Sequence, residues 1–126
     1  MPKNIYLNST EELIKYINGD LPNESLIILD SALEQLQLHS NFNASHVYLE
    51  VSEETKNLET IEKIWEIMFL SNLNRSDEVV IIGGGVMLDL CSFAASTYKR
   101  GVAFTLVPST LLAMVDASHG GKNGFN

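Results

Sequence analysis

Short, wholly apolar runs alternate along this chain with longer segments in which apolar residues recur at helical spacing. Residues 26–29 are all apolar and end at Asp30, and residues 79–82 form a similar run directly before three glycines. Such uninterrupted runs are typical of strands that are buried on both faces of a parallel sheet. The strands expected from this pattern cover residues 26–29, 47–51, 78–82 and 103–107, with an edge strand at 5–7.

The segments between these runs carry helix signals. Ile61, Ile64, Trp65 and Met68 follow the i, i+3, i+4, i+7 spacing of one helix face, which predicts a helix of about four turns from residue 58. Residues 9–12 (Ser-Thr-Glu-Glu) fit a capping box at the start of an earlier helix. Further helices are expected at residues 31–38, 86–99 and 111–117.

Strands that alternate with helices in this way predict an α/β fold. We expect a Rossmann-like, open and mainly parallel sheet with helices on both faces. The chain has 126 residues, and no internal repeat or linker divides it. Residues 1–126 are therefore expected to form a single domain, which is long enough to bury a core.

Composition narrows the classes of partner. Lys and Arg total 8 against 16 for Asp and Glu, so the formal net charge is −8. This charge argues against binding to nucleic acid, which needs a cationic surface, and against docking on an anionic membrane. The single cysteine, Cys91, excludes an internal disulfide framework, and its place in a predicted helix suits a small core residue. We expect a soluble, cytoplasmic protein with no nucleic-acid or membrane partner.

Residues 83–85 are three glycines between a predicted strand and a predicted helix. Backbone N–H groups at such a junction can point at a phosphate, and the helix N-terminus adds partial positive charge. The alternative is a tight turn that requires positive φ angles. The spacing is not the G-x-G-x-x-G pattern, because Val86 and Leu88 occupy positions where it would continue. Asp89, on the same helix, fits either a partner of the helix dipole or a hydrogen-bond acceptor for a ribose or nicotinamide group.

Several segments, taken in order, resemble the 3-dehydroquinate synthase family. The resemblance is dense after residue 78, and upstream the segment 53–60 and Asp30 also match the family. The segments that carry it are 83–89 (Gly-Gly-Gly-Val-Met-Leu-Asp), 93–95 (Phe-Ala-Ala), 98–101 (Tyr-Lys-Arg-Gly), 107–112 (Val-Pro-Ser-Thr-Leu-Leu) and 115–122 (Val-Asp-Ala-Ser-His-Gly-Gly-Lys).

This resemblance implies an activity. The family converts 3-deoxy-D-arabino-heptulosonate 7-phosphate to 3-dehydroquinate and phosphate in the shikimate pathway, using bound NAD and a zinc or cobalt ion, and it works as a homodimer. Its helical C-terminal domain carries the metal ligands, and it would lie beyond residue 126. The chain is therefore expected to be the NAD-binding N-terminal domain, with no metal ligand of its own and no full activity alone.

The resemblance also implies residue roles. Asp116 and Lys122 match substrate-binding positions, and Arg100 matches an arginine that reaches the partner subunit's substrate phosphate. The positions that match cofactor contacts are Asp30, Glu53, Lys56, Gly84, Gly85, Val86, Asp89, Ser109, Thr110 and Leu112. Simpler interpretations stay open: Glu53 and Lys56 fit an exposed charged face, and Arg100 fits a helix C-terminal charge before Gly101.

A few positions depart from the family pattern. Leu88 stands where the family has Gly, and it would either crowd the cofactor or turn away from it; Ala32 replaces an Asn beside Asp30. His39 and His46 lack the spacing of metal ligands and are expected to be structural or solvated. Two alternatives remain: a sibling sugar-phosphate cyclase, such as a 2-deoxy-scyllo-inosose or valiolone-type synthase, or a non-catalytic nucleotide-binding or dimerising module.

Overall fold

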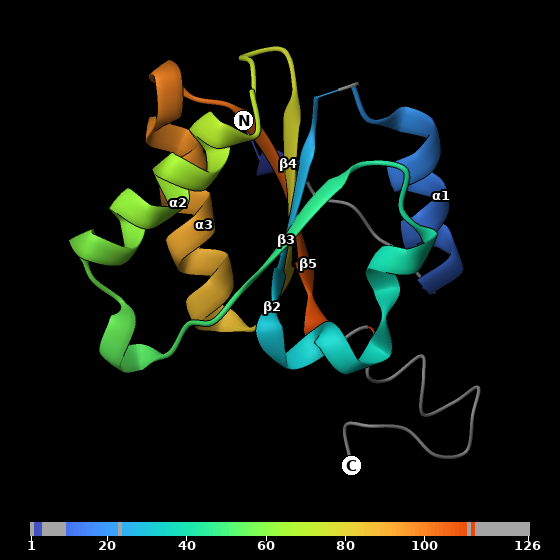
Figure 1. Ribbon diagram of the computed structural model, residues 1–126, viewed down its shortest axis with the longest axis horizontal. Helices are drawn as coiled ribbons and strands as arrows, with labels where there is room; N and C mark the ends of the chain where they lie inside the picture. The colour runs from blue at the N-terminus through green and yellow to red at the C-terminus, as the bar shows by residue number, and fades with distance from the viewer. Residues whose placement is uncertain (1, 4–9, 23, 111, 113–126) are drawn as a thin grey trace.

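The computed structural model describes residues 2–3, 10–22, 24–110 and 112 (Figure 1). In that part of the chain, five parallel strands form one sheet in the order β1-β5-β4-β2-β3. The strands are β1 (Pro2–Lys3), β2 (Leu26–Asp30), β3 (Ser45–Leu49), β4 (Glu78–Gly83) and β5 (Ala103–Pro108). The predicted α/β fold with an open parallel sheet is confirmed.

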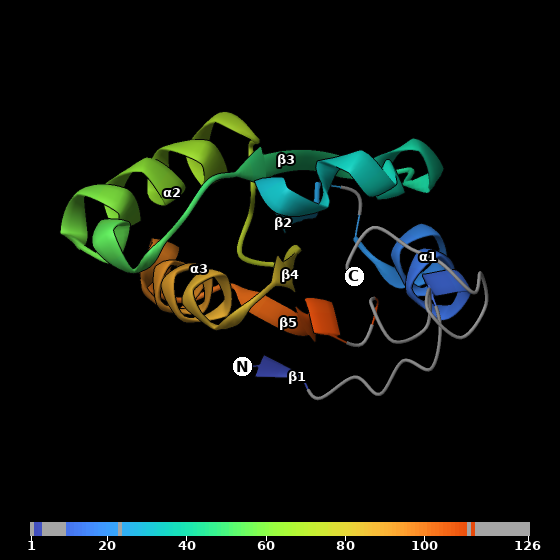
Figure 2. The same cartoon turned by 90° about the horizontal axis from the view of Figure 1, so that it is seen from below.

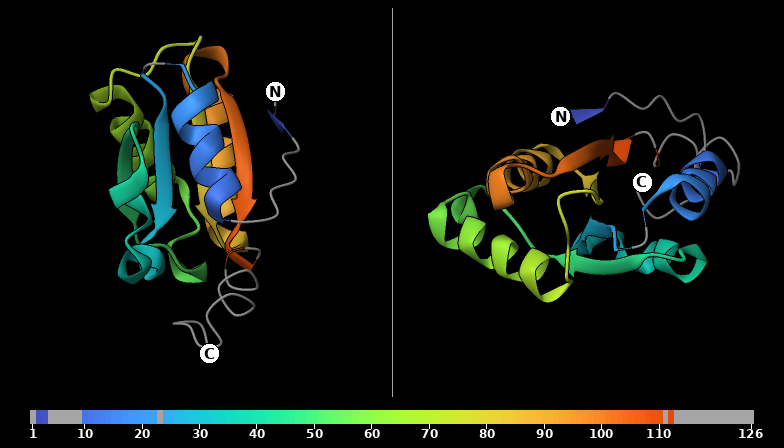
Figure 3. Two further views of the ribbon diagram at one scale, coloured as in Figure 1. Left: turned by 90° about the vertical axis from the view of Figure 1, so that its right-hand side faces the viewer. Right: turned by 90° about the horizontal axis from the view of Figure 1, so that it is seen from above.

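Helices cover both faces of the sheet, as predicted (Figures 2 and 3). The helices α2 (Leu58–Leu70) and α3 (Gly85–Thr97) pack side by side on one face. The helix α1 (Thr10–Asp20) and the 3-10 helices η1 (Ser31–Leu36) and η2 (Leu38–Asn41) cover the other face. Among the described residues, no helix is long and apolar enough to cross a membrane.

The central strands contribute alternate residues to two cores. Ile28 and Ile81 face the α2 and α3 side, where they join Ile64 and Met68, and Ile27 and Ile82 face the α1 side with Leu13. Because both faces are covered, the first four residues of β2 and all residues of β4 are buried. This explains why these strands have apolar runs without polar alternation.

The direction in which successive strands are added to the sheet reverses between β2 and β4. From β2 the chain crosses the α1 face through η1 and η2 to β3 at the sheet edge, and α2 then returns over the opposite face to β4 on the far side of β2. In open α/β sheets, ligands bind at the carboxyl ends of the strands at such a reversal. The residues that end these two strands are Asp30 and Gly83.

Three predicted elements differ from the structure or lie outside it. The strand expected at 47–51 is Ser45–Leu49, because its partner β2 ends at Asp30, which pairs with Leu49. The helix expected at 31–38 is two 3-10 helices, separated at Gln37 by a left-handed backbone with φ 52°. The edge strand expected at 5–7 lies outside the described residues, and so does most of the helix expected at 111–117.

Candidate functional site

The three glycines form the junction between β4 and α3. Gly83 is the last residue of β4, and Gly84 is the N-cap of α3 with an extended backbone, φ −87° and ψ −172°. Among the described glycines, positive φ occurs at Gly101 and at none of these three. The interpretation as a tight turn that requires positive φ is therefore wrong, and the glycines need another explanation.

Gly83 is explained by close packing. A Cβ atom added to it would lie 2.6 Å from Cγ of Met87 and 3.2 Å from Cβ of Asp30. Real Cβ atoms do not approach other atoms within 2.6 Å, so a side chain here would displace the first turn of α3. The absence of that side chain brings the end of β2 and the start of α3 together.

Gly84 and Gly85 are not explained by packing. Both residues are exposed, and no atom lies within 4 Å of the position that a Cβ would take at either one. The N-cap Gly84 provides no side-chain hydrogen bond to the helix, so the first N–H groups of this 13-residue helix have no side-chain cap. Open space beside N–H groups at a helix N-terminus suits a phosphate or diphosphate group, and the residues present therefore fit a dinucleotide.

Asp30 is held beside this junction. It is half-buried at the end of β2, and its Oδ1 accepts a hydrogen bond from the backbone N–H of Ala32 at 3.0 Å. That bond caps η1 and fixes the carboxylate at the carboxyl end of the strand. A carboxylate at this place in an α/β sheet can accept hydrogen bonds from ribose hydroxyls.

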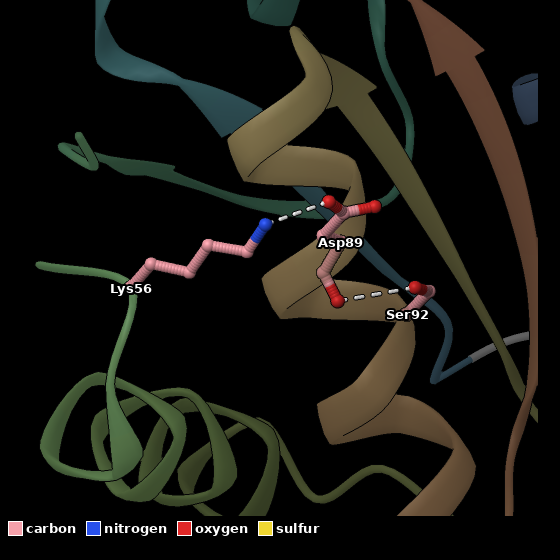
Figure 4. A network of polar contacts seen from close by, with 3 residues as sticks. All are labelled: Lys56, Asp89 and Ser92. Carbon is pink, nitrogen blue, oxygen red and sulfur yellow. Dashed lines mark hydrogen bonds and ion pairs between the residues drawn. The ribbon is translucent and has the colours of Figure 1, made fainter. Parts of the chain in front are cut away.

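Lys56, in the segment before α2, and Asp89, on α3, form an ion pair (Figure 4). Lys56 follows the short 3-10 helix η3 (Glu53–Thr55), and its Nζ lies 3.0 Å from Oδ2 of Asp89 on α3. The hydrogen bond and charge of Asp89 raise the pKa of Lys56 above its ordinary value, and the exposed Glu53 adds a smaller effect in the same direction. The structure thus brings together three residues that are predicted to contact the cofactor, Glu53, Lys56 and Asp89. Of these, Lys56 and Asp89 form the ion pair.

A pocket of about 280 Å³ adjoins this pair. Four of its lining residues, Asn57, Ile61, Leu90 and Phe93, are not among the predicted cofactor contacts. Asn57 caps α2, since its Oδ1 accepts a hydrogen bond from the N–H of Thr60 at 3.0 Å, and an Asn before a helical segment is a recognisable signal. Phe93 lies four residues after Asp89, a spacing that places both on one face of a helix.

The remaining predicted cofactor contacts lie near the carboxyl ends of the central strands or in the core next to them. Ser109 and Thr110 follow β5 directly in helical conformation, and β5 ends beside β4, where Pro108 pairs with Gly83. Val86 is half-buried against the core on the α2 and α3 side. Leu112 is buried in the core on the α1 side, so its side chain contributes to packing and not to the exposed surface of the site.

Leu88, which is expected to stand where the family has Gly, packs against the core. Its side chain is half-buried and packs against the core on the α2 and α3 side. Its backbone N–H donates to the carbonyl oxygen of Gly84 at 2.9 Å, an ordinary first helical hydrogen bond. This packing is compatible with a leucine that turns away from a bound cofactor, and whether it does so stays a prediction.

Arg100 does not lie near the glycine junction. It lies beyond the C-terminal end of α3, whose 13 residues span about 20 Å from the glycine junction. Asp116 and Lys122, the two predicted substrate contacts, and His119 lie outside the described residues. Within the described ranges, no group of three or more His, Cys, Asp and Glu side chains could hold a metal ion.

Comparison with known proteins gives consistent matches. Residues 46–126 match the family described as 3-dehydroquinate synthase N-terminal. The 3-dehydroquinate synthase of Campylobacter concisus (strain 13826) is 43% identical over 125 residues, which cover 97% of this chain and 35% of that protein. The chain therefore spans about a third of the length of this curated relative.

Solved structures share the fold. The 2-epi-5-epi-valiolone synthase ValA from Streptomyces hygroscopicus subsp. jinggangensis 5008, with NAD+ and Zn2+ bound, matches with a TM-score of 0.63 and 27% identity, covering 82% of this chain and 32% of that one. A 2-deoxy-scyllo-inosose synthase matches with a TM-score of 0.65 and 25% identity, covering 79% of this chain and 30% of that one.

Proposed function

Because the chain belongs to the 3-dehydroquinate synthase N-terminal family, we propose that it is the NAD-binding part of a 3-dehydroquinate synthase. The whole enzyme would convert 3-deoxy-D-arabino-heptulosonate 7-phosphate to 3-dehydroquinate and phosphate. The observation that carries the proposal is the open space at Gly84 and Gly85, next to Asp30, at the reversal of the sheet. Neither backbone conformation nor packing requires glycine at these two positions, whereas a closely approaching diphosphate does.

The residues at the carboxyl ends of β2 and β4 would bind different groups of the cofactor. The N–H groups of Gly84, Gly85 and Val86 at the start of α3 would hold the diphosphate, and Asp30 would accept hydrogen bonds from a ribose. The dinucleotide, when bound, supplies a hydride acceptor and donor for the reversible oxidation of a substrate hydroxyl. Lys56 and Asp89 offer a cation and an anion to polar groups of the cofactor beside the pocket.

Sequence identity favours this enzyme over a sibling cyclase. The chain is 43% identical to the Campylobacter synthase, against 27% to the valiolone synthase and 25% to the inosose synthase. We propose that the metal of the whole enzyme is held by residues other than the described ones. Growth of an auxotroph for aromatic amino acids, rescued by the full-length protein, would support the synthase, and failure with a well-expressed protein would favour a cyclase.

We also propose that the enzyme is a homodimer. Arg100 is exposed and lies at the end of α3 that is remote from the glycine junction, so it is poorly placed to serve its own subunit's cofactor edge. That position is compatible with a contact to the substrate phosphate in a partner subunit. Mixing inactive full-length Arg100→Ala with a second inactive variant, Gly84→Val, would restore partial activity if the arginine acts across subunits, and no activity if it acts within one.

The binding proposal is tested by calorimetric titration of the 126-residue chain with NAD+. We expect saturable binding, and a loss of at least about tenfold in affinity for Gly84→Val, because the new side chain fills the space next to the N–H groups. Gly19→Val is the matched control, since Gly19 in α1 also has no atom within 4 Å of its Cβ position. Absence of binding, or equal affinity of the two variants, would contradict the proposal.

A further inference from the structure

A second pocket, of about 350 Å³, lies between α2 and the C-terminal end of α3. It is lined by Trp65 and Phe69 of α2 and by Thr97, Tyr98 and Lys99, which end α3 and begin the 3-10 helix η4 (Tyr98–Arg100). The two helices run side by side, and the glycine junction is at the opposite end of α3 (Figure 1). The pocket is therefore distinct from the proposed NAD site.

Two aromatic side chains of α2 form an apolar wall of the pocket. Nε1 of Trp65 donates to the carbonyl oxygen of Ala94 at 3.2 Å and lies 3.1 Å from Oγ1 of Thr97, so the indole is anchored to α3. Phe69, one turn further along α2, is 66% exposed. Small-molecule sites are lined mainly by such apolar and aromatic side chains with a few polar groups.

Lys99 places a positive charge at the same pocket. Nζ of Lys99 lies 5.5 Å from the centre of the Tyr98 ring, and no carboxylate of the described residues forms an ion pair with it. Lys99 and Arg100 adopt positive φ angles of 46° and 71° directly after α3. Left-handed residues of this kind are common where a helix ends, and they turn the chain from α3 toward β5.

Tyr98, the residue before Lys99, also lines the pocket. Tyr98 is 7% exposed, and its buried hydroxyl oxygen has no hydrogen-bond partner in the described part of the chain. Buried hydroxyl groups are bonded in the large majority of structures. Because this oxygen is itself inaccessible, it lies beneath the pocket surface, and the polar group offered to a ligand is the ammonium of Lys99.

We propose that this pocket binds a small aromatic carboxylate, with its ring against Trp65 and Phe69 and its carboxylate at Lys99. The volume suits a ligand of about ten non-hydrogen atoms. The net charge of −8 gives the protein no general attraction for anions, so recognition depends on the local cations. The inference does not rest on the proposed NAD-binding function.

Trp65 provides the measurement, because it is the single tryptophan of the chain. Titration of the 126-residue chain with 3-phenylpropionate should change the Trp65 fluorescence in a saturable way, with a dissociation constant on the order of 1 mM for a ligand of this size. The uncharged 3-phenylpropanamide should bind at least about fivefold more weakly. Equal binding of acid and amide, or no saturation by the acid, would overturn the proposal.

Two matched variants test the cation. Lys99→Gln should weaken the binding of 3-phenylpropionate about fivefold or more, whereas Lys63→Gln removes an exposed α2 charge outside the pocket and should leave it unchanged. Far-UV circular dichroism checks that both variants fold, and the comparison of acid with amide on the unmodified chain does not depend on either. Equal affinity of the two variants would overturn the proposal, as would sedimentation data showing that a second copy excludes the ligand from this face.

Discussion

Lys56 and Asp89, 33 positions apart in the sequence, meet at 3.0 Å between Nζ and Oδ2. Each was expected to contact the cofactor, and the structure pairs them with one another beside a pocket. Both side chains remain accessible, at 42% and 65% exposure, so a ligand can reach the pair without displacing other groups. The ion pair therefore fixes the direction of two charged groups that a nucleotide could use.

The first prediction concerns this pair. Exposed ion pairs contribute little to stability, so Asp89→Asn should leave the melting temperature nearly unchanged. Its affinity for NAD+ should fall about tenfold, because a charged acceptor is lost and Lys56 loses the group that positions it. Glu62→Gln, an exposed change on α2, is the control and should alter neither quantity. A large loss of stability in Asp89→Asn, with unchanged affinity, would show a purely structural role.

The second prediction separates the glycines. Gly83→Ala should lower the free energy of unfolding by about 1–3 kcal/mol, because the added Cβ overlaps the Met87 side chain. Gly84→Ala should change it far less, since the space around that position is open. Chemical denaturation of both variants measures the difference. Equal stability would mean that the start of α3 adjusts freely and that Gly83 is not needed for packing.

Much of the fold could be predicted because the buried strands are covered on both faces. The apolar runs of β2 and β4 identify them, and the glycines mark where the second one ends. The end of β3 at Leu49 could not be predicted, because it depends on where the partner strand stops. The left-handed break at Gln37 is equally a matter of tertiary context, since Gln carries no strong signal for it.

The site was predictable in its position and less so in its contacts. The glycine junction and Asp30 were found from their place after apolar runs. The reason for Gly83 was not found, because it depends on Met87 and on Asp30 from a distant strand. Long-range polar contacts leave no local pattern either: the buried Glu78 accepts a hydrogen bond from the Tyr16 hydroxyl at 2.6 Å, 62 positions away.

The third prediction concerns Leu88. Its side chain packs against the core, so Leu88→Gly, which introduces the residue expected of the family, should destabilise the chain by about 1–3 kcal/mol through lost burial and the helix cost of glycine. The affinity for NAD+ should not rise, because the leucine side chain is packed against the core and is expected to leave the junction open. Leu88→Ala isolates the loss of burial. A clear gain in affinity for Leu88→Gly would show that the leucine does crowd the cofactor.

The fourth prediction concerns a histidine pair at the β3 edge. The rings of His39 and His46 stack with centres 4.8 Å apart, and Nδ1 of His39 lies 2.7 Å from the Tyr48 hydroxyl. Burial, and secondarily the charge of His39, lowers the pKa of His46 below 6.5. Burial raises the pKa of Tyr48, with a smaller contribution from Glu34, so its hydroxyl stays protonated near neutral pH.

The sign of the pH effect follows from the lowered pKa of His46. The folded state favours the neutral imidazole, so the stabilisation is present above pH 6.5 and is lost as the pH falls through the lower folded pKa. His46→Gln should therefore be less sensitive to acid than the unmodified chain in that window. Chemical denaturation at a series of pH values in this window measures how the stability of each protein depends on pH. NMR titration of the His46 ring measures its pKa. A ring pKa at or above 6.5, or identical acid sensitivity of the two proteins, would contradict the prediction.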